Sequence, residues 1–206
     1  MATLAEFRAM QAAVTSKAIP RSHTAVLVDG GDATSPYGTV HSRNKELTGR
    51  RVAAGILAML YGNTSVPTMG PTFASATYGM ASQGSLTVNV SFAPGTVGEG
   101  GLVWVPPTVS PWSNATRCPT EVLHFTAANC GWFQILGSDQ RAYNVTQVEI
   151  LGGGQGALLR LTAEGVPSLV LARGSRFGWA DWPVVNVYGV YEGGVELPMV
   201  PWSDYS

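Results

Sequence analysis

The spacing of the apolar residues changes once along the chain, and this change limits the possible fold more than any other feature. In residues 1–62 the apolar residues recur at the three- and four-residue spacing of helices, apart from one short apolar run. From residue 66 onward, helical spacing gives way to short runs of β-branched and aromatic residues, separated by Gly, Pro, Asn and Ser. The chain is therefore predicted to be an α+β protein with two domains, residues 1–62 and 66–206.

The first region is predicted to contain helix, strand, long loop and helix. Residues 3–18 form the first helix, with Thr3 as its N-cap, and TAVLVD at 24–29 is the strand. The second helix covers residues 43–61, with Ser42 as its cap. Its apolar stripe is formed by Leu47, Val52, Ile56, Leu57 and Leu60. One strand cannot complete an α/β sheet, because a parallel strand needs neighbours.

The second region has the pattern of an antiparallel β-sandwich. Its β-type runs are SLTVNVSF, GLVWVPP, EVLHFTA, WFQIL, QVEIL, ALLRLTA, SLVLARG and VVNVYGVY. The glycine clusters at 98–101 and 152–156 do not match a phosphate-binding loop, because neither contains the Lys-Ser/Thr pair and no helix follows GGGQG. We interpret them as hairpin and loop glycines.

Charge and composition exclude several classes of function. The chain has 12 Lys and Arg against 13 Asp and Glu, without a dense basic stretch, which argues against nucleic-acid binding. No apolar run reaches the roughly 18 residues of a membrane span. No Cys-x-x-Cys pair or Cys/His cluster has metal-ligand spacing, so neither a metal nor another cofactor is expected.

Two features indicate an oxidising compartment. Cys118 and Cys130 are the only cysteines and could form a disulfide, the alternative being two buried thiols. Four triplets match the N-glycosylation pattern, at Asn63, Asn89, Asn114 and Asn144. The expected location is secreted or lysosomal. The N-terminus MATLAEFRAMQ does not have the pattern of a signal peptide. We therefore expect either that the true N-terminus is a different one or that the targeting signal lies on a larger precursor.

The C-terminal stretch is rich in aromatic residues. They are Trp179, Trp182, Tyr188, Tyr191 and Trp202. These side chains could form a platform on which sugars stack, or they could pack one part of the protein against another. The interleaved prolines and apolar residues favour packing.

His41 is the strongest candidate for a chemical role. It follows the predicted strand on a long loop, just ahead of a helix, and functional sites of α/β sheets gather at such positions. Asp29 and Asp32 are the carboxylates available to orient it, and an oriented histidine can take a proton from a serine nucleophile. A structural or surface role for His41 is the alternative. His23 and His124 are interpreted as surface and structural residues.

The sequence around His41 resembles the final catalytic block of the sialate O-acetylesterase family, a branch of the SGNH hydrolases. The resemblance is carried by DGGDATSPYGTVHSRNKELTGRRVA, which starts at Asp29. The matching positions are Asp29, Asp32, the Ser-Pro-Tyr-Gly at 35–38, His41, Arg43, Lys45, Arg50 and Arg51. The tail is also similar, through RFGWADWPVVNVY and the LPMVP that begins at Leu197.

The resemblance implies a metal-independent serine esterase that removes O-acetyl groups from sialic acid or related sugars. His41 corresponds to the general base, Asp32 is the first candidate for its orienting acid, and Asp29 is the second. The sequence departs from the pattern of the family near His41 in two ways. Gly38 and Thr39 occupy positions where many relatives place an Asp, and Ser42 replaces the proline that usually follows the histidine.

The Gly-x-Ser-Asn block that carries the family's nucleophile has no counterpart in the sequence. Residues 1–62 are therefore expected to be the C-terminal piece of a flavodoxin-like SGNH hydrolase domain, inactive alone. Activity would need the N-terminal half of that domain, as a separate chain or on a precursor, and an O-acetylated sugar as substrate. The alternative is a non-catalytic carbohydrate-binding or structural β-sandwich protein with a relict α/β stub.

Overall fold

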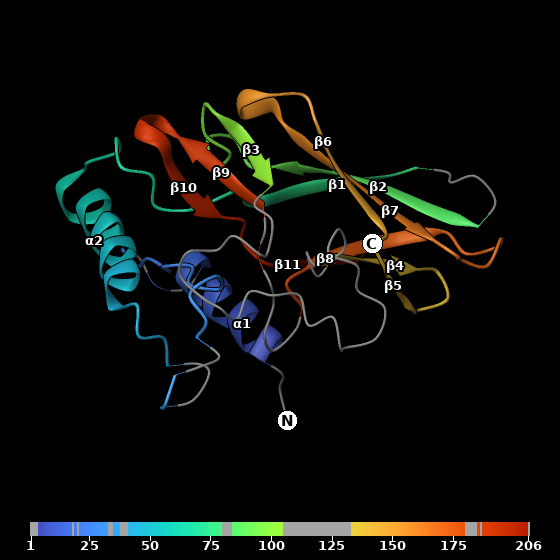
Figure 1. The fold of residues 1–206 in the computed structure, drawn as a ribbon, viewed down its shortest axis with the longest axis horizontal. Coiled ribbons are helices and arrows are strands. Elements are labelled where there is room, and N and C mark those ends of the chain that lie inside the picture. The colour runs from blue at the N-terminus through green and yellow to red at the C-terminus, as the bar shows by residue number, and fades with distance from the viewer. Residues whose placement is uncertain are drawn as a thin grey trace.

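The described strands all belong to antiparallel β-sheets, with two α-helices beside them (Figure 1). The computed structural model describes residues 4–17, 19, 21–32, 35–37, 41–79, 84–104, 133–179, 185 and 187–205, without the side chains of residues 14–17. The helices are α1 (Leu4–Lys17) and α2 (Lys45–Tyr61). Neither of these two helices is long and apolar enough to cross a membrane.

The strands of the described residues form three sheets. They are β1 (Phe73–Gly79), β2 (Ser85–Phe92), β3 (Gly101–Trp104), β4 (Phe133–Gly137), β5 (Ala142–Asn144), β6 (Gln147–Leu151), β7 (Leu158–Glu164), β8 (Ala172–Phe177), β9 (Val187–Tyr191), β10 (Val195–Pro198) and β11 (Trp202–Tyr205). Their orders are β1-β2-β7-β6, β10-β9-β3 and β11-β8-β4-β5. Neighbouring strands are antiparallel throughout, which confirms an α+β protein that is mostly β.

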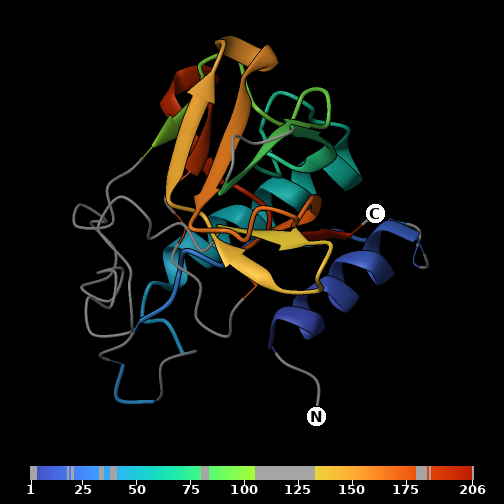
Figure 2. The ribbon, with the colours of Figure 1, turned by 90° about the vertical axis from the view of Figure 1, so that its right-hand side faces the viewer.

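The main core lies between the two four-stranded sheets. Alternate residues of β2 and β7 are buried, as the period of a strand with one covered face requires. They meet the buried residues of β4 and β8, among which Ile135 and Phe177 are fully buried. Figure 2 shows β4 and β5 crossing below the long strands β6 and β7. The sheets therefore share one core. The predicted run EVLHFTA lies outside the described residues.

Two of the aromatic residues near the C-terminus, Tyr191 and Trp202, are packing residues. Trp202 is buried, and its ring stacks on Phe73 with 5.5 Å between centroids. Tyr191 is also buried and donates hydrogen bonds to the carbonyls of Met69 and Thr96. For these two residues the packing interpretation is confirmed, because a buried ring cannot stack on a sugar. Trp182 lies outside the described residues.

Both predicted helices are present, and their ends follow ordinary capping rules. The α2 helix starts one residue after Asn44, whose Oδ1 accepts the amide of Leu47 at 3.0 Å. Ser42, the predicted cap, instead accepts the amide of Asn44 on its Oγ at 3.1 Å. The helix ends at Gly62, which has a φ of 65° and donates to the carbonyl of Leu57. Thr3 lies outside the described residues.

The strand predicted over residues 24–29 is wrong. Residues 24–27 belong to no sheet, and the chain then turns, with the amide of Gly30 donating to the carbonyl of Leu27 at 2.9 Å. A strand exists only through its ladder partners, and none of the described strands pairs with this segment. Its apolar side chains are used differently, since Val28 packs against the main core.

The predicted apolar stripe of α2 is also wrong as the buried face of the helix. Val52, Ile56, Leu57 and Leu60 are exposed, with Leu60 at 61% of its full surface. The buried face consists of Arg51, Ala54 and Gly55. Its small residues let the ring of His23 approach the helix backbone, because a Cβ at Gly55 would lie 2.0 Å from His23 Cδ2. Shape and charge at this contact therefore outweigh the hydrophobic stripe.

Candidate functional site

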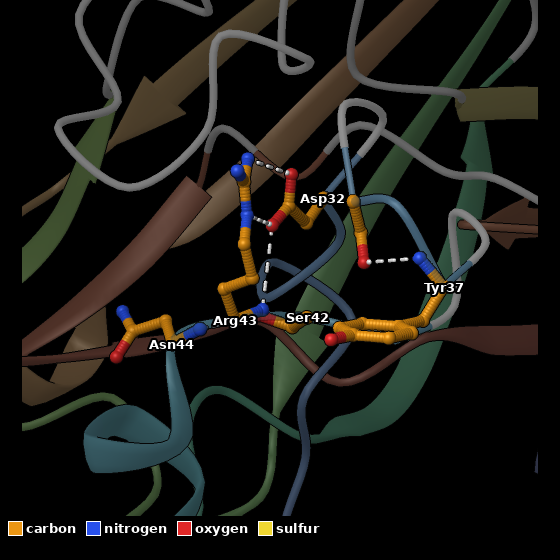
Figure 3. Close-up of polar contacts among 6 residues, drawn as sticks. Asp32, Tyr37, Ser42, Arg43 and Asn44 are labelled. Atoms are coloured by element: carbon orange, nitrogen blue, oxygen red, sulfur yellow. Dashed lines mark hydrogen bonds and ion pairs between the residues drawn. The ribbon is translucent and has the colours of Figure 1, made fainter.

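Two carboxylate–guanidinium pairs join the segment before the His41 loop to the segment after it. Asp29 pairs with Arg51, and Asp32 pairs with Arg43. We call these the inner and the outer ion pair. The segment that carries the acids therefore lies alongside the start of α2, and His41 lies two residues before the outer pair (Figure 3 shows the outer pair).

The inner ion pair is buried and bidentate. Arg51 Nη1 lies 2.5 Å from Asp29 Oδ1, and Nη2 lies 2.7 Å from Oδ2. The same Nη1 donates to the carbonyl of Val26 at 2.8 Å. Tyr188 on β9 adds a hydrogen bond from its hydroxyl to Asp29 Oδ2 at 3.3 Å. Burial, reinforced by the charge of Asp29, raises the pKa of Tyr188, so this hydroxyl stays a donor.

The outer ion pair closes the loop that carries His41. Asp32 Oδ2 accepts from Arg43 Nε at 2.6 Å, and Asp32 Oδ1 accepts from Nη2 at 2.9 Å. The backbone amide of Arg43 also lies 3.3 Å from Oδ2 (Figure 3). The hydrogen bond and the charge of Asp32 raise the pKa of Arg43. Asp32 is buried, whereas the side chain of Arg43 is 57% exposed.

His41 itself is exposed at the end of this loop. Within the part of the chain that the structure describes, it forms no hydrogen bond or ion pair with Asp29 or Asp32, which are both held by arginines. A general base needs a nucleophile within hydrogen-bond reach. The catalytic roles of His41, Asp32 and Asp29 therefore stay predictions. Gly38 and Thr39 lie outside the described residues.

The role of the two arginines is the part of the site that sequence reasoning missed. Arg43 and Arg51 carried the family resemblance without a role of their own. The available signal was Arg51 at the start of an otherwise apolar stretch, RVAAGILAML. A charged residue on a covered helix face is almost always paired, and two aspartates lay in the same block.

His23 is half-buried and packs against α2, so it is not a fully exposed surface residue. Its Nε2 is buried, has no hydrogen-bond partner among the described residues, and sits against Gly55 of α2. Burial lowers the pKa of His23, which favours the neutral ring. His124, Cys118 and Cys130 lie outside the described residues, so the disulfide stays a prediction.

The candidate glycosylation residues have different surroundings. Asn63 is exposed just after α2, and its Oδ1 accepts from the hydroxyl of Ser65 at 2.7 Å. Asn89 on β2 is half-buried and accepts from Arg160, and Asn144 on β5 accepts from Gln134. Asn114 lies outside the described residues. The attachment of a glycan to any of these asparagines stays a prediction.

Comparison with known proteins gives distant similarity to solved structures alone. No protein-family profile matches the chain, and no curated protein matches it. Among solved structures, the chain is similar to a carbohydrate acetylesterase from Xanthomonas citri, with 19% sequence identity and a TM-score of 0.48. The match covers 86% of this chain and 31% of that enzyme, so the chain spans about a third of the enzyme's length.

Proposed function

We propose that the chain is the C-terminal part of a sialate O-acetylesterase-like carbohydrate esterase and that it supplies the histidine base, His41. The sequence resemblance around Asp29 to Arg51 motivates the proposal. The observation that carries it is geometric. His41 is exposed on a loop whose two ends are held together by Asp32 and Arg43, at the start of α2. A base that must meet a nucleophile from elsewhere needs this combination of anchoring and exposure.

The chemistry divides between this chain and a nucleophile-bearing half. Neutral His41 would accept the proton of a serine hydroxyl while the serine oxygen attacks the acetyl carbonyl. The resulting imidazolium would then protonate the departing sugar oxygen, which leaves an acetyl-serine. Water, deprotonated by the same imidazole, would release acetate and restore the serine. The serine and the donors that stabilise the oxyanion would come from the other half, so the isolated chain is expected to be inactive.

Exposed apolar side chains on both helices support a missing neighbour. On α2 these include Val52, Ile56 and Leu60, and on α1 they include Phe7 and Met10. A cluster of large apolar residues on a helix surface is typical of a face that another element covers. The hydrolase half that carries the nucleophile is the neighbour that fits the proposed function.

Ester hydrolysis tests the proposal directly. The isolated chain should not turn over para-nitrophenyl acetate or an O-acetylated sialic acid in a manner sensitive to a fluorophosphonate. Mixing it with the N-terminal half of a sialate O-acetylesterase should produce such turnover. His41→Gln should then lower turnover by about a hundredfold or more, as expected for loss of a general base.

The matched control is Arg50→Gln, because Arg50 is an exposed residue of α2 that pairs with Glu46 on the same helix. It should leave the turnover of the mixture unchanged. Fluorophosphonate-sensitive turnover by the isolated chain would contradict the proposal, and so would a mixture in which His41→Gln has no effect.

A further inference from the structure

Asp32, the first candidate to orient His41, directs its carboxylate at Arg43 instead. Three hydrogen bonds reach this carboxylate from Arg43, two from the guanidinium and one from the backbone amide. A carboxylate offers about four acceptor positions, so most of the capacity of Asp32 is used by this one residue. A bidentate guanidinium is also a stronger partner than a single imidazole N–H.

The residue that Asp32 holds, Arg43, directly precedes the residue that caps α2. Arg43 is followed by Asn44, whose amide donates to the hydroxyl of Ser42 and whose side chain caps α2. His41 precedes Ser42, so the residues just after the histidine are fixed in turn by the outer ion pair, the Ser42 turn and the cap. The position of His41 relative to α2 therefore depends on Arg43 as much as on Asp32.

We propose that Asp32 and Arg43 act together as a positioning pair for His41, with Asp32 acting through Arg43 and not through a bond to the imidazole. The inference rests on the proposed function, in which His41 is the base. It replaces a direct carboxylate–histidine contact with an ion pair that fixes the backbone on the C-terminal side of the histidine. Both residues are then needed, and to the same extent.

The two arrangements predict opposite effects for loss of Arg43. If Asp32 oriented His41 directly, removing Arg43 would free the carboxylate and would not harm the histidine. If the pair acts as a unit, Asp32→Asn and Arg43→Gln loosen the same backbone. The double variant then adds nothing to either single change, because interacting residues are not additive.

Amide hydrogen exchange in the isolated 206-residue chain is the first measurement. Asp32→Asn and Arg43→Gln should each make the amides of residues 41–47 exchange about tenfold faster. A change of this size is expected when a hydrogen bond to a charged group is lost. The double variant should match the single variants. Arg50→Gln, a control on the exposed side of α2, should leave these amides unchanged.

An Asp32→Asn effect without an Arg43→Gln effect would overturn the proposal, as would additive effects in the double variant. If either variant also accelerates exchange at the core residues Val88 and Leu161, the whole fold has been weakened. Arg43→Lys then decides, because it keeps the charge and loses the bidentate geometry. Faster exchange confined to residues 41–47 supports the pair, and unchanged exchange there refutes it.

The reconstituted esterase gives a second measurement that a merely structural role would not move. Asp32→Asn and Arg43→Gln should lower kcat by similar factors while KM stays unchanged, and the double variant should resemble either one. A far larger loss for Asp32→Asn than for Arg43→Gln would overturn the proposal. If wild-type halves show no turnover, the proposed function fails while the exchange measurement still tests the ion pair.

Discussion

At the scale of single residues, two glycines of α2 should respond in opposite directions to the same substitution. Gly49 has open space where a Cβ would lie, whereas at Gly55 the Cβ would be 2.0 Å from His23 Cδ2. Gly49→Ala should stabilise the protein by about 0.5–1 kcal/mol through helix propensity. Gly55→Ala should destabilise it by about 1–3 kcal/mol through overpacking. Urea unfolding measures both changes in the free energy of unfolding. If the two changes had the same sign, the described packing around α2 would be contradicted.

His23 should make stability depend on pH in a known direction. Burial lowers its pKa below the ordinary value of 6.5, so at mildly acidic pH the unfolded chain binds more protons than the folded one. The contribution of neutral His23 to the stability of the fold is fully present above about pH 6.5. It decreases as the pH falls through and below that value. His23→Gln should flatten this slope in urea unfolding curves. Asp139, whose pKa is lowered by a hydrogen bond from Tyr143, contributes only at much lower pH, so it does not mask the effect.

At the scale of elements, local signals in the sequence predicted the helices well and their surroundings poorly. The start of α2 and its end at Gly62 follow from capping, which depends only on neighbouring residues. Its buried face depends on Asp29 and His23, which come from another segment, so periodicity alone selected the wrong stripe. The strand predicted at 24–29 failed for the same reason, because ladder partners cannot be read from the segment itself.

The inner ion pair provides the prediction that belongs to this scale. Arg51→Met should destabilise the protein by about 3–5 kcal/mol, because it leaves the buried carboxylate of Asp29 without its counter-charge. Arg51→Met combined with Asp29→Leu should recover much of that loss, since no buried charge remains. Arg50→Met is the matched control, and loss of its exposed pair should cost less than about 1 kcal/mol. Equal unfolding free energies for the two single variants would show that the inner pair is not buried in solution.

At the scale of the whole molecule, the helical region and the sheets are tied together at several points. Tyr188 of β9 reaches Asp29, and Arg8 of α1 donates to the carbonyl of Gly178 at 2.9 Å. These bonds cross the boundary predicted between residues 62 and 66, and the division into two domains stays a prediction. Strand composition could be predicted from alternation, as in β2, but not the pairing of β2 with the distant β7. Such pairings are fixed by the common core and not by local sequence.

The exposed apolar side chains of α2 give the prediction for the molecule as a whole. Ile56 and Leu60 lie one helical turn apart and are both exposed, so the isolated chain should self-associate as its concentration rises. Sedimentation velocity should show this for the wild type and a monomer for the Ile56→Lys, Leu60→Lys double variant. The unfolding free energy should change by less than about 0.5 kcal/mol, because surface substitutions rarely exceed that.

The same double variant links this surface to the proposed function. If the nucleophile-bearing half covers α2, the variant should fail to restore esterase activity in the mixture, although it keeps His41 and both ion pairs. Arg50→Gln, on α2 but away from the face of Ile56 and Leu60, should complement normally. Full complementation by the double variant would mean that the apolar side of α2 is not where the other half binds. The nucleophile would then have to reach His41 from a side of the protein other than the apolar side of α2.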